Sequence, residues 1–218
     1  MKKRQSRVFQ RFLRLFAATM VVLIVGLFSG GDSGATTLSS NMTADDAFEL
    51  YISTNANVAG TLIGTGNWWP TTYSFNAALT PGVTNYIHVK AWDVYGYISS
   101  FIGDFSLSDT AFTFSNGTQT LGTNTSNWGV NTVGFGNPYS APLDYGLNGV
   151  GPWGFIPGIG IGPSAHFIWE PSGGLGVAYF ATSIIPTQAV PEPSTLLLLG
   201  SGMAGLSLVI RLRKSHKA

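Results

Sequence analysis

The chain has 218 residues and a formal net charge of +1, but its charged residues are distributed very unevenly. Six of the eleven basic residues lie in the first fourteen positions and four in the last eight, which leaves only Lys90 for the middle of the chain. Eight acidic residues fall in 36–188, so this segment has a net charge of −7 and is unsuited to binding nucleic acid, whose phosphates require cations. The absence of cysteine excludes disulfide bonds and thiolate metal sites.

The N-terminal segment has the order of a secretory signal peptide. A basic stretch precedes an apolar block over Leu15–Phe28, and Ser33 and Ala35 occupy the −3 and −1 positions of a signal-peptidase site. These features predict a signal peptide over 1–35. Because the apolar block is long for a signal peptide, an uncleaved anchor helix is the alternative.

The segment 36–188 has the pattern of a single exported all-β domain. Its short apolar runs are separated by Gly, Asn, Thr and Pro, and it has little amphipathic helical periodicity. Alternation is clearest over Ala47–Ile52 and Tyr86–Trp92, and strand character resumes at Phe167–Trp169 after a Gly/Pro-rich stretch over 133–162. We therefore predict a β-sandwich of the jelly-roll type.

Two local features of this domain give more detailed predictions. Asn116-Gly117 interrupts an apolar run, and since this pair accepts the positive φ values of a tight turn, it predicts a β-hairpin. His88 shares a strand face with Lys90 and is expected at the solvated surface, whereas His166 is expected to be a half-buried residue at the start of a strand.

Four stretches in the first half of the domain occur in a familiar order: Thr43–Ile52 with its Ala-Asp step, Gly64–Trp68, the Leu-Thr-Pro-Gly turn at 79–82, and Tyr86–Ala91. This order resembles the galactose-binding-like jelly roll of carbohydrate-binding modules. The resemblance implies a sandwich whose loops bind a sugar. In the family an Asn-Gly turn follows the acidic strand, whereas this chain has a longer loop over Ser53–Gly60, so the family's binding loop cannot be transferred.

Aromatic residues supply the candidate carbohydrate-binding site. Trp68, Trp69 and Tyr73 lie in a turn-like Gly-Asn-Trp-Trp-Pro context, and flat rings on loops can stack against the faces of sugars. The alternative is that one or both tryptophans close the end of the sandwich. Tyr95 and Tyr97 form a second candidate pair.

Candidate chemistry beyond aromatic stacking is limited. Asp45 and Asp46 are adjacent before a strand and could contribute oxygen ligands to calcium, although a solvated acidic surface is the alternative. No cofactor other than this calcium is expected. The sequence has no nucleophile elbow and no cysteine, so we expect a protein without catalytic residues, with an exported carbohydrate-active enzyme or its accessory domain as the alternative.

The C-terminal segment 189–218 has three parts in a fixed order. Pro191, Glu192 and Pro193 are followed by an apolar stretch over Leu196–Ile210 and then by a basic cluster of Arg211, Arg213 and Lys214. A helix over the apolar stretch is about 22 Å long, less than the ~30 Å hydrocarbon core, so it predicts a marginal transmembrane anchor. The basic cluster should remain cytoplasmic and leave the acidic domain outside.

This tail resembles the PEP-CTERM sorting signal of exosortase substrates. The resemblance implies that Pro191–Pro193 are the recognition segment of an exosortase-type processing enzyme and that the basic cluster stops transfer across the membrane. It also implies that the domain faces the periplasm before processing and then reaches the cell surface or a biofilm's extracellular matrix. The predicted function is an exported surface or matrix protein whose candidate ligand is exopolysaccharide.

Overall fold

The computed structural model describes residues 35–96, 98–150, 154 and 161–187. The predicted signal peptide up to position 34, Tyr97, the sorting residues Pro191–Pro193, the anchor helix and the basic cluster lie outside these residues. In the described ranges no helix is long and apolar enough to cross a membrane.

The described part of the chain is all β, with two antiparallel sheets and no helix, as predicted. Its twelve strands are β1 (Thr37–Asp45), β2 (Ala47–Ser53), β3 (Thr61–Gly66), β4 (Tyr73–Ala78), β5 (Asn85–Trp92), β6 (Ser100–Leu107), β7 (Phe112–Phe114), β8 (Thr120–Gly122), β9 (Gly129–Asn131), β10 (Leu143–Leu147), β11 (His166–Trp169) and β12 (Val177–Pro186). The two alternating runs seen in the sequence are therefore β2 and β5, and the strand expected at Phe167–Trp169 is β11.

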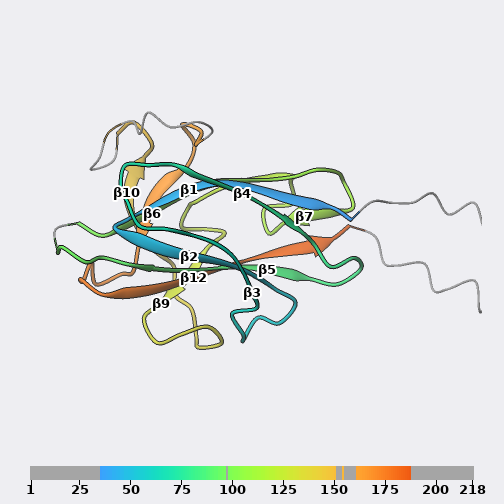
Figure 1. Ribbon diagram of the computed structural model, residues 1–218, viewed down its shortest axis with the longest axis horizontal. Coiled ribbons are helices and arrows are strands. Elements are labelled where there is room, and N and C mark those ends of the chain that lie inside the picture. Colours follow the sequence, from blue (N-terminus) through green and yellow to red (C-terminus); the bar gives the residue numbers. More distant parts are fainter. Residues whose placement is uncertain (1–34, 97, 151–153, 155–160, 188–218) are drawn as a thin grey trace, which may run out of the picture. The chain divides into compact units, whose positions relative to one another are not determined.

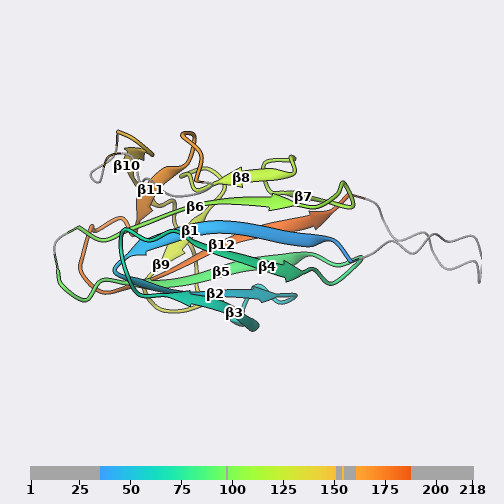
Figure 2. The same cartoon turned by 45° about the horizontal axis from the view of Figure 1, so that its top comes forward.

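The strands form two layers of a sandwich (Figures 1 and 2). Sheet A has the order β10-β11-β6-β1-β4, with β8 paired to β6, and sheet B has the order β3-β2-β5-β12-β7, with β9 paired to β12. The chain passes between the layers repeatedly, and the jelly-roll and galactose-binding-like assignments stay predictions.

Large aromatic side chains fill the space between the two sheets. The ring of Phe48 on β2 meets Tyr73 on β4 edge to face at 5.6 Å, and Phe101 on β6 meets Phe180 on β12 at 5.0 Å. Both aromatic pairs join sheet A to sheet B, and Phe48, Phe101 and Phe180 are fully buried. Such side chains bury large apolar areas, so the domain has a substantial core without disulfide bonds.

The prediction of a β-hairpin at Asn116-Gly117 is wrong, because the strands on either side of this turn do not pair with each other. The turn exists, since Gly117 has a φ of 79° and the Phe114 N–H donates to the Thr118 carbonyl. However, β7 pairs with β12 in sheet B whereas β8 pairs with β6 in sheet A, so the turn carries the chain from one layer to the other. Phe114 and Leu121 are both buried in the core, and tertiary burial rather than turn chemistry decides the pairing.

The expectation that His88 is solvated is also wrong. His88 is fully buried because the loop after β9 folds over the outer face of sheet B and lays the ring of Phe135 on it. His166 is half-buried at the start of β11, as predicted, and its Nδ1 lies 3.0 Å from both carboxylate oxygens of Asp144 on β10.

The first and last strands of the domain are attached to one turn, Ser108–Ala111. The Thr36 hydroxyl donates to Asp109 Oδ1 at 2.8 Å, and the Ser108 N–H donates to the Thr37 carbonyl. The Thr187 N–H donates to the Ala111 carbonyl at 2.9 Å. The start of β1 and the end of β12 therefore lie together at one end of the sandwich, here called the terminal end (Figure 1).

Candidate functional site

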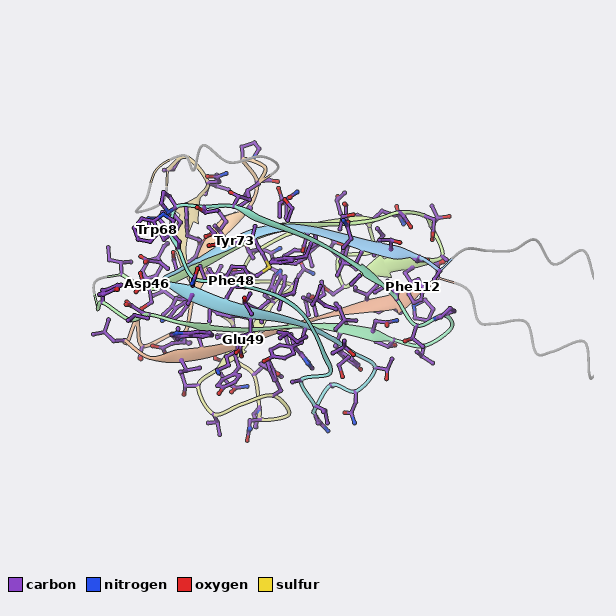
Figure 3. The ribbon with its side chains drawn as sticks, viewed as in Figure 1. Asp46, Phe48, Glu49, Trp68, Tyr73 and Phe112 are labelled. Atoms are coloured by element: carbon purple, nitrogen blue, oxygen red, sulfur yellow. The ribbon has the colours of Figure 1, made fainter. Side chains whose placement is uncertain are left out.

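The opposite end of the sandwich, here called the far end, gathers the loops that carry the candidate residues. Three pairs of residues on neighbouring strands lie at the far end: Asp45 with Ser100, Phe48 with Gly66, and Trp92 with Val177. The connections that leave these positions are 67–72, 93–99 and 170–176. Figure 3 shows Trp68 and Asp46 at this end and Phe112 at the terminal end.

The three predicted aromatic residues do not form one platform. Trp68 leaves 64% of its surface exposed, whereas Trp69 is half-buried with its ring 6.2 Å from Phe167 on the outer side of sheet A. The ring of Tyr73 packs against the core at Phe48, and its hydroxyl accepts the Asn67 N–H at 3.3 Å. Of the three rings, Trp68 alone is largely open to solvent.

Further exposed apolar side chains lie on the far-end loops. Tyr95, the second candidate from the sequence, is 84% exposed, and its neighbour Val94 is 59% exposed. Leu175 is 63% exposed and lies close to the 93–99 loop, since a Cβ on Gly96 would be 3.2 Å from its side chain. Sequence reasoning missed Val94 and Leu175; the only signal for Leu175 is a single apolar residue flanked by glycines.

Two carboxylates hold the 93–99 loop in place. Asp46 Oδ2 accepts the N–H groups of Val94 and Tyr95 at 2.8 and 3.1 Å. Asp93 Oδ1 accepts the N–H groups of Tyr95 and Gly96, and its Oδ2 accepts the Ser99 hydroxyl. Charge-assisted bonds of this kind are stronger than neutral ones, so these side chains fix the backbone that presents Tyr95.

Asp45 has an unusual protonation state for a carboxyl group. Burial, a hydrogen bond with Asp46 and the negative charges of Asp46 and Asp93 raise the pKa of Asp45 to about 7. A substantial fraction of Asp45 is therefore protonated at neutral pH.

The expected calcium site gains no support from this arrangement. Asp46 already uses an oxygen to bind backbone N–H groups. Within 35–96, 98–150, 154 and 161–187, no three His, Cys, Asp or Glu side chains gather in a way that could hold a metal ion. Calcium binding by Asp45 and Asp46 stays a prediction.

Comparison with known families identifies the tail. Residues 189–214 match the PEP-CTERM protein-sorting motif, and this confirms the resemblance of the C-terminal segment. The matched range includes Pro191–Pro193 and the basic cluster, whose individual roles stay predictions. No curated protein and no solved structure matches the chain.

Proposed function

We propose that this chain, which carries a PEP-CTERM sorting motif, is a non-catalytic protein of the cell surface or extracellular matrix whose folded domain binds exopolysaccharide. The motif at 189–214 carries the first half of the proposal, since it indicates an exported protein that is held at the membrane and processed by an exosortase. Delivery to the surface or matrix is the destination that fits such processing.

The exposed ring of Trp68 carries the second half of the proposal. Trp68 leaves 64% of its surface exposed, so its ring is accessible to a ligand, and covering it would contribute about 25 cal/mol per Å² of apolar area removed from water. Aromatic faces bind the apolar faces of sugar rings while the hydroxyl groups stay hydrated. Tyr95 adds a second exposed ring on the far end.

The position of Trp68 supports the same function. The described chain ends at Thr187, which is hydrogen-bonded to the Ser108–Ala111 turn at the terminal end. Trp68 lies at the other end of the sandwich (Figure 3). The aromatic residues are thus separated by the length of the domain from the point at which the chain continues toward its sorting tail.

Retention on the producing cells' own exopolysaccharide tests this function. Full-length protein should be retained, and Trp68→Ala should lower retention about tenfold while leaving the melting temperature unchanged. Val58→Ala is the matched control, because Val58 is 54% exposed on the loop between β2 and β3. Equal retention of wild type and Trp68→Ala would contradict the proposed role of Trp68.

One observation favours the alternative of a carbohydrate-active enzyme. Asp45 titrates near neutral pH beside a second carboxyl group, as a general acid can. Against this, glycosidases separate their two carboxyl groups by about 5 Å or more, whereas Asp45 and Asp46 are in hydrogen-bond contact. Release of reducing sugar from a panel of polysaccharides, abolished by Asp45→Asn, would support the enzyme instead.

A further inference from the structure

A polar pocket of about 270 Å³ opens on the outer face of sheet A. It is lined by Asn41 on β1, by Asp104 and Ser106 on β6, by Thr120 and Gly122 on β8, and by Ser164 before β11. The absence of a side chain at Gly122 creates part of this space, since a Cβ there would lie 3.1 Å from Asp104 Oδ1. No local pattern in the sequence groups these residues into one binding site.

Asp104 has one carboxylate oxygen engaged and one available. Its Oδ2 accepts the Gly162 N–H, which fixes the orientation of the carboxylate. Its Oδ1 has no hydrogen-bond partner among the residues that the structure describes, and it faces Gly122. Burial raises the pKa of Asp104, and the bond from Gly162 opposes this effect.

Asn41 provides a donor beside this acceptor. Its Oδ1 accepts the Ser74 hydroxyl at 2.5 Å, which orients the amide, and its Nδ2 makes no hydrogen bond within the described residues. Ser106, Thr120 and Ser164, which carry hydroxyl groups, also line the pocket. The pocket thus offers an anionic acceptor, an amide donor and three hydroxyl groups, the set of partners that a polyhydroxylated ligand requires.

The pocket lies on the same face of sheet A as the apolar cluster against which Trp69, the neighbour of Trp68, packs. Ile102 precedes Asp104 by two residues on β6, so both side chains are on the outer face of sheet A. Ile102 belongs to a small apolar cluster on this face, and Trp69 packs against that cluster. Trp69, the neighbour of Trp68, and Asp104 therefore both lie on the outer side of sheet A.

We infer that this pocket binds one uncharged sugar unit of a polysaccharide, with Asp104 Oδ1 accepting hydrogen bonds from its hydroxyl groups and Asn41 Nδ2 donating to its oxygens. The inference rests on the proposed function and specifies the sugar class. A uronate unit is disfavoured because its carboxylate would face Asp104 in a domain that already has a net charge of −7.

Titration calorimetry of the full-length chain in lipid nanodiscs, without sugar-based detergent, tests this pocket. The probes are gluco-, manno- and galacto-oligosaccharides, with oligogalacturonate as the anionic counterpart. At least one neutral probe should bind wild type at least tenfold more tightly than oligogalacturonate does. Asp104→Asn should weaken that binding at least tenfold. The Gly162 N–H needs an acceptor, so it should hold the amide oxygen of the asparagine and leave the amide NH₂, a donor, facing the pocket. The same variant should discriminate less strongly against uronate.

Two further variants separate occlusion of the pocket from misfolding. Gly122→Ala keeps the carboxylate but places a methyl group against Oδ1, and should also weaken binding at least tenfold. Asn41→Ala should weaken binding. Asn76→Ala is its matched control and should not, because Asn76 lies outside the pocket. Both asparagines accept a serine hydroxyl across the pair β1 and β4, Asn41 from Ser74 and Asn76 from Ser39. Melting temperatures identify any variant that has lost its fold.

The outcomes distinguish the pocket from the proposed function. If Asp104→Asn and Gly122→Ala bind neutral oligosaccharides as wild type does while Trp68→Ala does not, the pocket inference is overturned and the proposed function stands. If folded wild type binds none of the probes and is not retained on the cells' exopolysaccharide, both are overturned. Oligogalacturonate binding as tightly as the neutral probes overturns the assignment of an uncharged sugar.

Discussion

The imidazole ring of His88 lies stacked on the ring of Phe135, with centroids 4.5 Å apart and ring planes 17° apart. Phe135 also meets Tyr51 and Tyr179 edge to face, so one loop residue joins aromatic side chains from three strands. His88 Nδ1 lies 3.3 Å from the Ala59 carbonyl oxygen, and its buried Nε2 has no partner in the described part of the chain. The site favours a neutral histidine.

Acidification should therefore destabilise the domain through His88. Burial lowers the pKa of His88 in the folded state below its ordinary value of 6.5. As the pH falls below about 6.5, the unfolded chain takes up a proton that the folded chain does not, and stability is lost. His88→Phe, which keeps a stacked ring, should show a smaller loss of melting temperature between about pH 7.5 and 5 than wild type. Parallel pH profiles would contradict this.

Asp45 should act in the opposite direction. Its pKa is raised to about 7 in the folded state, so the folded chain holds a proton that the unfolded chain releases above about pH 4. The stability from this proton is complete below about pH 4 and is lost as the pH rises through 7. Urea midpoints of Asp45→Asn, compared with wild type at about pH 5 and 8, should show that wild type loses stability at the higher pH and the variant less so.

The Ser108–Ala111 turn should control both ends of the domain together. Asp109 accepts the Thr36 hydroxyl and the Ala111 N–H, and the latter bond is the main reason that its pKa is lowered. Because one net hydrogen bond contributes about 1 kcal/mol, Asp109→Ala should accelerate amide exchange at 36–38 and at Ile185 and Thr187 about fivefold. Asp144→Asn, a change distant in sequence on β10, is the control and should leave exchange at these positions unchanged.

The neighbouring tryptophans should respond differently to truncation. Trp69 is half-buried against Phe167 and the cluster around Ile102, so Trp69→Ala should cost about 3 kcal/mol of folding free energy. Trp68→Ala should change the free energy of unfolding by less than about 0.5 kcal/mol, because its ring is mostly in water. Chemical denaturation of both variants measures this difference, and equal losses would refute the division of roles.

The sequence predicted those parts of the fold that depend on local pattern. Alternation located β2 and β5, and the order of motif, apolar stretch and basic residues identified the sorting tail. Turn chemistry located the reversal at Gly117 but not the strands that it connects, because pairing depends on which residues the core buries.

Contacts between distant segments could not be read from the sequence. Nothing near His88 indicates that Phe135, 47 residues later, will cover it. Likewise, Trp69 packs against Phe167 on β11, whereas Tyr73 packs against Phe48 on β2, so the two rings lie against different strands. The pocket at Asp104 requires β1, β6 and β8 to lie side by side, and no local spacing predicts that arrangement.

The most direct test of this account is the C-terminus of the protein that reaches the cell exterior. Mass spectrometry of wild type should show loss of the segment after the Pro191–Pro193 motif, whereas changing Pro191, Glu192 and Pro193 to alanine should leave export intact and trap an unprocessed, membrane-bound form. Both proteins should have the same mature N-terminus near Thr36. A triple-alanine variant that is processed and released like wild type would contradict the assignment of this motif to sorting.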